Sequence, residues 1–594
     1  MAYIEINNLK VDHKSFEGIR NVLDVDHLEI EKGTTYGIVG ESGSGKTVLA
    51  LTILKMLQCP PGIISSGSIK IDGMEILDKS EHFMENQIRG SKVTMIFQDP
   101  MSSLNPVFTV GTQLKNVIER RKGLKGKACH DEILHLLDVV ELPDAESTMA
   151  KYPHQLSGGQ RQRIIIALAL ACGCEFLIAD EPTRNLDVTI QASILKLLKG
   201  LQRDFGLTVL FIANNLSLVS AFCDEVGILY HGKIIERGTP AKIIGNPENE
   251  YTKALIEAVK TRTRPSKEDS SNEVILKVDH LKKYFDVSTE LHHSQEKLKA
   301  VDGVSFELKR GEVLGIVGES GCGKSTLVNT ILKLYEPTSG HVYFNGQDIF
   351  NMNDREVKDI HKKIQIVFQD PYWSLNPRWL IKDIIAEPIV VHEKCSRHEM
   401  LEKVRNLLKM VDLPEESAYM YPHEFSGGER QRIAIARSLA SKPELVVLDE
   451  PTSSIDVFSQ AKILALLKKL KGDFNLTNIL ISHDLSVVSQ MANKIAVMYL
   501  GKIVEYGNAD LIFNNPKHPY TVALFNAIPQ LNTNGVDALT ILQGNVPSAI
   551  HLPTGCRFHT RCNRAMAICS ESEPQEKEVD GRMVGCWLYE NKKN

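Results

Sequence analysis

The sequence predicts an α/β protein with two tandem domains of one kind, each built around a loop that binds phosphate. The pattern G-x-x-x-x-G-K-T occurs at residues 40–47, and G-x-x-x-x-G-K-S occurs at 318–325. Each copy follows an apolar, strand-like run and precedes a helical pattern, which is the context that a phosphate-binding loop requires. Further motifs recur in the same order in both halves, and the offset between copies settles at 269 residues (426 − 157 and 449 − 180). An ordered repeat of this kind indicates duplication of a whole domain.

The repeat divides the chain of 594 residues into four parts. We expect a first domain at 1–260, a linker at 261–273, a second domain at 274–530 and a C-terminal extension at 531–594. The linker sequence TRTRPSKEDSSNE is polar and charged and contains one proline, which is typical of linkers.

Charge and sequence pattern argue against nucleic-acid binding, a signal peptide and a membrane-spanning helix. The formal net charge is −5, so the sequence lacks the basic excess that usually accompanies nucleic-acid binding. The first residues show no basic segment followed by an apolar core, so we expect no signal peptide. The longest uncharged stretch, Phe205 to Cys223, is interrupted by Gly206 and by Asn214-Asn215, which predicts a strand followed by a helix and not a membrane span. Any role at a membrane therefore requires a partner.

Each phosphate loop supplies groups that suit a nucleotide. Glycines let backbone N–H groups surround the β-phosphate, and the helix that follows adds a favourable dipole. Lys46 and Lys324 are expected to reach the phosphates, and a glycine-rich turn with an incidental lysine is the alternative, against which two complete copies argue. The nucleotide-binding residues expected here are Gly40, Ser42, Gly43, Gly45, Lys46 and Thr47 in the first loop, and Gly318, Ser320, Gly321, Gly323, Lys324, Ser325 and Thr326 in the second.

Two acidic residues follow a buried apolar strand in each half, Asp180-Glu181 and Asp449-Glu450. The ends of such strands lie at the crevice where α/β proteins bind ligands. We expect Asp180 and Asp449 to bind Mg²⁺ together with the hydroxyls of Thr47 and Ser325. Glu181 and Glu450 are expected to orient or deprotonate the attacking water. A capped strand end is the alternative for either pair alone, but the phosphate loop upstream in both halves favours the catalytic interpretation.

A Ser-Gly-Gly motif precedes a long basic and apolar helical pattern in each half. It comprises Ser157, Gly158, Gly159 and Gln160 in the first half and Ser426, Gly427, Gly428 and Glu429 in the second. The simplest interpretation is a serine N-cap. The functional interpretation is a helix N-terminus that receives a γ-phosphate.

Together with Gln98, Gln369 and His483, these motifs resemble the ATP-binding cassette (ABC) family over nearly the whole chain. The resemblance implies that each domain has a RecA-like α/β core with a helical subdomain. It also implies that the cassettes pair head to tail, so that each ATP, with Mg²⁺, lies between the phosphate loop of one and the signature of the other. One chain could then form the pair without a homodimer. The family usually stacks an aromatic residue on adenine, a role that falls to Tyr284 in the second half.

The two halves differ at positions that matter for hydrolysis. Asn214 stands where the second half has His483 (483 − 269), and Arg184 stands where it has Ser453. Asparagine can donate a hydrogen bond but cannot carry a charge. We therefore expect one competent site, with Lys324, Ser325, Gln369, Asp449, Glu450 and His483 closed by residues 157–160. The other, with Lys46, Thr47, Gln98, Asp180 and Glu181 closed by 426–429, is expected to bind ATP and hydrolyse it poorly. Tolerance of Asn214, because Glu181 remains, is the alternative.

Four cysteines, Cys556, Cys562, Cys569 and Cys586, lie near the C-terminus without any C-x₂₋₄-C pair. In a reducing compartment, clustered thiolates indicate a metal more than disulfides. The missing close pair disfavours zinc, and four-cysteine ligation also suits an iron–sulfur cluster. Residues 555–562 and 515–524 resemble the C-terminal region of oligopeptide and dipeptide permease ATPases, some of which hold a 4Fe–4S cluster. We expect such a cluster, with zinc or metal-free thiols as alternatives.

The resemblance implies the ATPase motor of an importer for peptides or a related small solute, at the cytoplasmic face of the membrane. Segments after Gln98 and Gln369 would transmit motion to two membrane permease subunits, and an extracytoplasmic solute-binding protein would deliver the solute. The alternative is a soluble double-cassette ATPase in translation or DNA repair. Such proteins tend to carry a long charged arm or zinc fingers, and the linker here is short. Peptides, nickel, glutathione and metal chelates are all possible solutes at this point.

Overall fold

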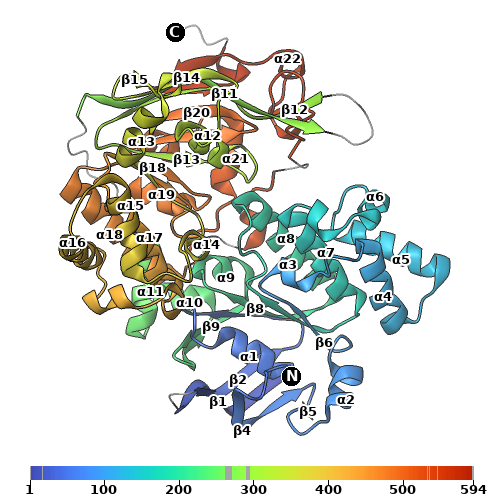
Figure 1. Ribbon diagram of the computed structural model, residues 1–594. Coiled ribbons are helices and arrows are strands. Elements are labelled where there is room, and N and C mark those ends of the chain that lie inside the picture. The colour runs from blue at the N-terminus through green and yellow to red at the C-terminus, as the bar shows by residue number, and fades with distance from the viewer. Residues whose placement is uncertain are drawn as a thin grey trace. The chain divides into compact units, whose positions relative to one another are not determined.

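The computed structural model describes residues 2–590, except 16–17, 261–270, 289–294, 454, 532, 534, 543 and 545. Most of the predicted linker at 261–273 lies outside the described residues. The chain separates into two compact units. The first comprises Met1–Lys260 with Asp456–Phe458 and Ala527–Thr540, and the second comprises the remainder (Figure 1).

The first unit contains two sheets. One is antiparallel, in the order β2 (Gly18–Glu31), β1 (Ala2–Ser15), β4 (Gly62–Ile71) and β5 (Met74–Glu75). The other has the order β10 (Lys233–Gly238), β9 (Glu225–Tyr230), β3 (Thr35–Val39), β8 (Thr208–Ala213), β7 (Phe176–Asp180) and β6 (Val93–Ile96). The five strands from β9 to β6 are parallel, and every residue of β3, β8 and β7 is buried, as expected for central strands covered on both faces.

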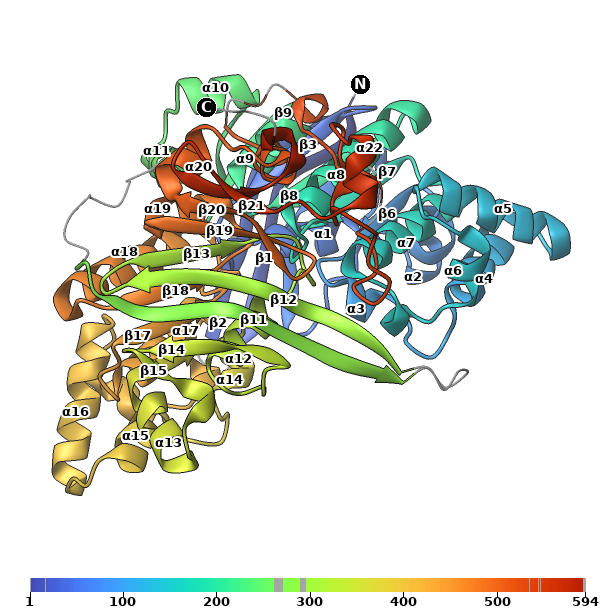
Figure 2. The same ribbon diagram turned by 90° about the horizontal axis from the view of Figure 1, so that it is seen from above.

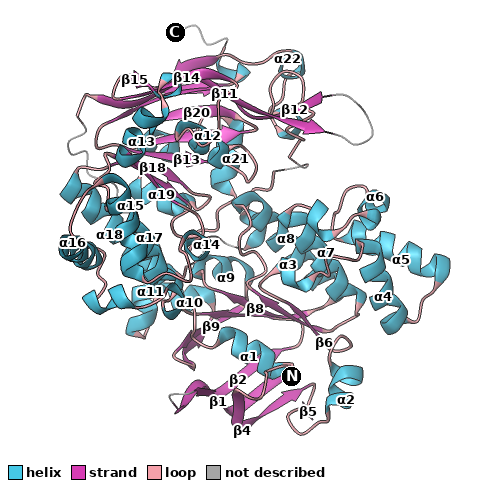
Figure 3. Cartoon of the chain, in the orientation of Figure 1, coloured by secondary structure: helices cyan, strands magenta, loops and turns pink. Residues whose placement is uncertain are grey.

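The helices of the first unit separate into those beside the parallel sheet and a helical lobe. Helices α4 (Val110–Lys122), α5 (Gly126–Val139) and α6 (Ala145–Ala150) pack with α7 (Gly158–Ala171) in this lobe (Figure 3). The predicted strand and helix within 205–223 are confirmed as β8 and α9 (Leu216–Phe222). The remaining helices are α1 (Lys46–Ile53), α2 (Glu81–Phe83), η1 (Met84–Ile88), α3 (Pro100–Ser103), η2 (Pro153–Gln155), α8 (Val188–Phe205), α9 (Leu216–Phe222), α10 (Pro240–Gly245) and α11 (Glu250–Lys260).

The second unit repeats this architecture and extends it. Its antiparallel sheet has the order β12 (Gln295–Lys309), β11 (Val274–Ser288), β14 (Ser339–Phe344) and β15 (Gln347–Asp348), and β11 and β12 form the long hairpin of Figure 2. The larger sheet has the order β16 (Ile364–Val367), β17 (Leu445–Asp449), β18 (Thr477–Ile481), β13 (Val313–Val317), β19 (Lys494–Tyr499), β20 (Lys502–Asn508), β22 (Arg582–Gly585) and β21 (Glu576–Val579). The first six strands match the order in the first unit, and the C-terminal strands β22 and β21 lengthen the sheet at the β20 edge.

The helices of the second unit follow the same plan. Helices α15 (Ile381–His392), α16 (Arg397–Met410) and α17 (Gly427–Leu439) pack together as a second helical lobe. The others are α12 (Lys324–Ile331), η3 (Ile349–Asn351), α13 (Asp354–Lys363), α14 (Pro371–Ser374), η4 (Glu415–Tyr419), η5 (Pro422–Glu424), α18 (Val457–Phe474), α19 (Leu485–Met491), α20 (Ala509–Asn514), α21 (Pro519–Asn526), η7 (His559–Arg561), α22 (Ala567–Glu571) and η8 (Trp587–Tyr589). None of the described helices is both long and apolar enough to cross a membrane.

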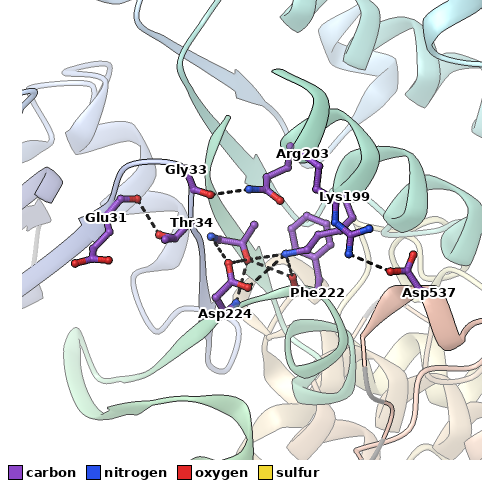
Figure 4. A network of polar contacts seen from close by, with 10 residues as sticks. Glu31, Gly33, Thr34, Lys199, Arg203, Phe222, Asp224 and Asp537 are labelled. Atoms are coloured by element: carbon purple, nitrogen blue, oxygen red, sulfur yellow. Dashed lines mark hydrogen bonds and ion pairs between the residues drawn. The ribbon is translucent and has the colours of Figure 1, made fainter. Parts of the chain in front are cut away.

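The segment after the second cassette does not form the separate extension expected at 531–594. Residues Ala527–Thr540, with η6 (Val536–Ala538), belong to the first unit, where Val536 and Leu539 are buried in its core cluster. Arg203 near the end of α8 donates to Asp537 at 3.0 Å. Figure 4 includes this contact. Residues 541–594 instead group with the second unit. Residues 527–540 join the first unit because Val536 and Leu539 are buried in the core around α8. Residues 541–594 join the second unit because β22 pairs with β20.

Candidate nucleotide and catalytic sites

The first phosphate loop lies between β3 and α1 and wraps around its lysine. Lys46 Nζ donates to the carbonyl oxygens of Gly40 at 2.8 Å and Glu41 at 2.7 Å. Gly45 has a φ of 106°, in the left-handed region that favours glycine. A Cβ at Gly40 would lie 2.2 Å from the carbonyl oxygen of Leu229. The glycines of the motif are therefore required by the shape of the loop.

The second phosphate loop, between β13 and α12, has the same geometry. Lys324 Nζ donates to the carbonyl oxygens of Gly318 at 2.7 Å and Glu319 at 3.0 Å. Gly323 has a φ of 107°, and a Cβ there would lie 2.1 Å from the carbonyl oxygen of Ala300. Each lysine is thus fixed by its own loop, with its helix N-terminus beside it. The loop residues Ser42, Gly43, Ser320, Gly321 and Ser325 are exposed, and Thr326 is half-buried.

The strand-end aspartates lie beside the loop hydroxyls, and their binding of Mg²⁺ stays a prediction. Thr47 Oγ1 donates to Asp180 Oδ2 at 2.8 Å, and Ser325 forms the corresponding hydrogen bond with Asp449. The second carboxylate oxygen of each aspartate is buried without a hydrogen-bond partner in the described chain. Burial, with the charge of Glu450 beside it, raises the pKa of Asp449 to about 6. A hydroxyl next to an unpaired carboxylate oxygen fits Mg²⁺, which binds one or two protein oxygens together with phosphates and water.

Glu450 contacts both Gln369 and His483, the other predicted catalytic residues of the second cassette. Gln369 Nε2 donates to Glu450 Oε2 at 2.6 Å, and His483 Nδ1 lies 3.1 Å from Glu450 Oε1. Glu450 has a φ of 48°, in the left-handed region, so the chain turns sharply as it leaves β17. Burial acts to raise the pKa of Glu450, but the hydrogen bond and charge of His483, the charge of Lys324 and the hydrogen bond from Gln369 together hold that pKa below the ordinary value. This arrangement maintains a carboxylate that can accept a proton from water.

Glu181 of the first cassette has different partners. Gln98 Nε2 donates to Glu181 Oε2 at 3.0 Å, as in the second cassette. Arg184 Nη1 donates to the same oxygen at 2.9 Å and forms an ion pair with it. Burial raises the pKa of Glu181 above its ordinary value, and the charge of Arg184 and a hydrogen bond with Asn214 offset only part of this rise. One carboxylate oxygen is therefore already shared between an amide and a guanidinium.

Both Ser-Gly-Gly motifs begin helices, which confirms the N-cap interpretation. Ser157 and Ser426 cap α7 and α17, and Gln160 and Glu429 complete capping boxes. A Cβ at Gly159 would lie 2.8 Å from Ile190 Cγ2, so close packing also requires this glycine. The role of residues 157–160 and 426–429 in contacting phosphate stays a prediction.

Tyr284 lies on β11 with its hydroxyl hydrogen-bonded to Asp302, and Arg557 donates to the other oxygen of Asp302. The phenol end of the side chain is thereby fixed. Stacking of the Tyr284 ring on adenine stays a prediction.

The four C-terminal cysteines gather in one place. The backbone N–H of Cys556 donates to the carbonyl of Cys569 at 2.8 Å. Burial raises the pKa of Cys586 to about 11, and the other three thiols add to this rise. All four are free thiols. Within the described part of the chain, however, no three His, Cys, Asp or Glu side chains are placed so that they could hold a metal ion. The iron–sulfur cluster, zinc and metal-free thiols therefore all stay predictions.

Two features of these sites had no role in the sequence-based expectations. The first is the pairing of Arg184 with Glu181, which the difference between Arg184 and Ser453 signals without naming the partner. The second is a buried ion pair between Glu319 and Arg561 of the cysteine segment, which no local pattern indicates.

The two phosphate loops, their strand-end acids and the serine-capped helices define an ATP-binding cassette ATPase. The chain belongs to the ABC transporter family, whose model matches residues 23–184 and 301–453. The model described as "Oligopeptide/dipeptide transporter, C-terminal region" matches residues 235–280 and 504–569. These matches confirm the predicted family, the tandem cassette fold and the ATPase activity.

Curated relatives resemble the chain over most of its length. It is 39% identical over 584 residues to the glutathione import ATP-binding protein GsiA of Shigella boydii serotype 4 (strain Sb227), covering 92% of this chain and 93% of that protein. The same figures hold for the protein of that name from Escherichia coli (strain K12). Among solved structures, a dimeric ATP-binding cassette in a post-hydrolysis state with ADP and Pi matches 39% of this chain and 98% of its own, at 31% identity and a TM-score of 0.36.

Proposed function

We propose that the chain is the ATP-hydrolysing motor of an importer for peptides or a related small solute such as glutathione. Its partners are two membrane permease subunits and an extracytoplasmic solute-binding protein, and it acts at the cytoplasmic face of the membrane. The observation that carries this proposal is the match of the oligopeptide/dipeptide C-terminal region after both cassettes. The relatives named for glutathione import, 39% identical along 92% of this chain, add support.

Exposed apolar side chains that follow Gln98 and Gln369 in the sequence support docking to a permease. Val107 and Phe108 follow Gln98, and Trp373 and Trp379 follow Gln369. These four side chains are exposed, Trp373 to 82% and Val107 to 71%. In each cassette, large apolar side chains exposed in this way are typical of a site that a partner covers.

Uptake and co-purification together test this function. In cells that lack the chain, uptake of labelled glutathione or of a labelled dipeptide should fall to background. Wild type should restore it, and the phosphate-loop variant Lys324→Ala should not.

Trp373→Ala should lower recovery of permease subunits with the chain by about tenfold, the loss typical of an aromatic anchor. Phe474→Ala, which removes a ring at the end of α18 that is 46% exposed, is the control. Unchanged uptake, or recovery with ribosomes or DNA instead of membrane subunits, would overturn the proposal.

The two ATP sites are proposed to be unequal. The site with Lys324, Glu450 and His483 hydrolyses ATP, and the site with Lys46 and Glu181 mainly binds it. As the family resemblance implies, residues 157–160 complete the former and residues 426–429 the latter. Support comes from the different partners of the two glutamates, since Glu450 has His483 beside it and a lowered pKa, whereas Arg184 pairs with Glu181.

We also propose that Cys556, Cys562, Cys569 and Cys586 bind a 4Fe–4S cluster. Their convergence supports this, because each cysteine of such a cluster binds a different iron and the sulfurs need not approach as they do around one ion. Anaerobically purified chain should contain about four iron and four sulfide per chain, and Cys562→Ser should lose both. One zinc per chain, or no metal at all, is the result that contradicts this proposal.

A further inference from the structure

Arg561 connects the cysteine segment, residues 556–586, to the second phosphate loop. Its Nη1 donates to Glu319 Oε2 at 2.6 Å, and its Nη2 donates to Glu319 Oε1 at 3.0 Å. The two side chains are only 5% and 2% exposed. A bidentate guanidinium–carboxylate pair of this kind is both strong and geometrically specific. When such a pair is buried, loss of one partner leaves an uncompensated charge in the interior.

The cysteine segment holds Arg561 in a fixed position. Residues His559–Arg561 form the turn η7, between Cys556 and Cys562. The backbone N–H of His559 donates to the carbonyl of Cys556 at 3.0 Å, and that of Arg561 donates to the carbonyl of Phe558 at 3.0 Å. The Phe558 ring packs against the rings of Tyr499 and Tyr520, at centroid distances of 5.3 and 5.4 Å. The Arg561 guanidinium therefore extends from a turn that backbone hydrogen bonds and the packed Phe558 ring hold in place.

Glu319 occupies a critical place in the phosphate loop. Its carbonyl oxygen accepts the hydrogen bond from Lys324 Nζ at 3.0 Å, and its backbone N–H donates to the Tyr520 hydroxyl at 2.9 Å. The carboxylate held by Arg561 therefore belongs to the residue whose carbonyl fixes the loop lysine. The first cassette is followed by a linker and has no cysteine segment of this kind in its sequence.

We propose that Arg561 is a positioning residue for ATP binding by the second cassette. Through Glu319 it holds the phosphate loop in the shape that receives the β- and γ-phosphates, with Lys324 aligned. Loss of Arg561 weakens nucleotide binding in the second cassette and leaves the first cassette unaffected. This inference rests on ATP binding by the second cassette and not on the transported solute.

The test uses the full chain and a fluorescent methylanthraniloyl derivative of ATP with Mg²⁺. In a Lys46→Ala background, which removes binding by the first cassette, Arg561→Gln should raise the Kd by about tenfold or more. The double variant Glu319→Gln with Arg561→Gln should recover most of the affinity, because neither buried charge is then left alone. Arg564→Gln, in the same segment but exposed, is the matched control and should bind as the background does.

Specificity for the second cassette separates positioning from general loss of structure. In a Lys324→Ala background, where binding reports the first cassette, Arg561→Gln should leave the Kd unchanged. An unchanged Kd in the Lys46→Ala background, or an equal rise in both, would overturn the proposal. If Arg561→Gln does not fold, Arg561→Lys carries the same test, since it keeps the charge and loses the two parallel hydrogen bonds. Binding is measured without permeases, so failure of import would leave this result standing.

Discussion

Replacing Glu450 with glutamine is expected to lower the ATPase kcat of the full chain by about 10²–10⁴-fold, the range for loss of a general base. The matched change Glu181→Gln is expected to leave most of the activity in place. The reason is that His483 lies 3.1 Å from Glu450 and helps to hold its pKa low, whereas Glu181 shares one oxygen between Gln98 and Arg184. Glutamine preserves the size of each side chain, so the comparison isolates the charge.

Phosphate release at saturating MgATP measures this difference. His483→Ala should reduce kcat by about 10²–10³-fold, the range for loss of one positioned charge-stabilising group. Each variant should still bind ATP with unchanged Kd, which excludes a folding defect as the cause. Equal losses from Glu181→Gln and Glu450→Gln would show two equivalent catalytic sites.

The second large effect is a gain of activity in the first cassette. In a chain that already carries Glu450→Gln, the double change Arg184→Ser with Asn214→His is expected to raise the residual kcat by about 10²-fold. Serine is the residue at the matching position, Ser453, and releases Glu181 from its 2.9 Å pairing with the guanidinium. Histidine restores the residue type that lies against Glu450 in the second cassette.

Two control variants show how much of the gain in kcat comes from releasing Glu181 and how much comes from the new histidine. Arg184→Lys with Asn214→His keeps a cation near Glu181 and should recover less, whereas Asn214→His alone tests the histidine without release of the carboxylate. The account fails if the double variant binds ATP normally and its residual phosphate release does not increase.

Much of the fold follows from local sequence patterns. The apolar runs 36–39 and 314–317, each leading into a glycine-rich loop, correctly predict β3 and β13 with a lysine at the start of the next helix. Serine followed three residues later by glutamine or glutamate correctly predicts the capped starts of α7 and α17. These predictions succeed because periodicity, loop glycines and caps act within a few residues of one another.

The remaining features depend on contacts between distant residues or on unusual backbone geometry. Arg561 and Glu319 are 242 residues apart, and neither lies in a pattern that names the other. The left-handed conformation of Glu181 and Glu450 could not be predicted from the sequence either, because glutamate has no intrinsic preference for positive φ. The packing of Val536 and Leu539 in the core of the first unit depends on a hydrophobic surface formed around α8 only after folding.

We propose that the chain binds two ATP molecules and hydrolyses mainly one of them. The most direct test of this proposal is the nucleotide composition of wild-type chain that has been loaded with MgATP, passed through one round of hydrolysis, separated rapidly from free nucleotide and analysed chromatographically. We expect two nucleotides per wild-type chain, one ADP and one ATP, and two ATP per chain in the Glu450→Gln variant. Two ADP per wild-type chain, or a single bound nucleotide, would contradict it.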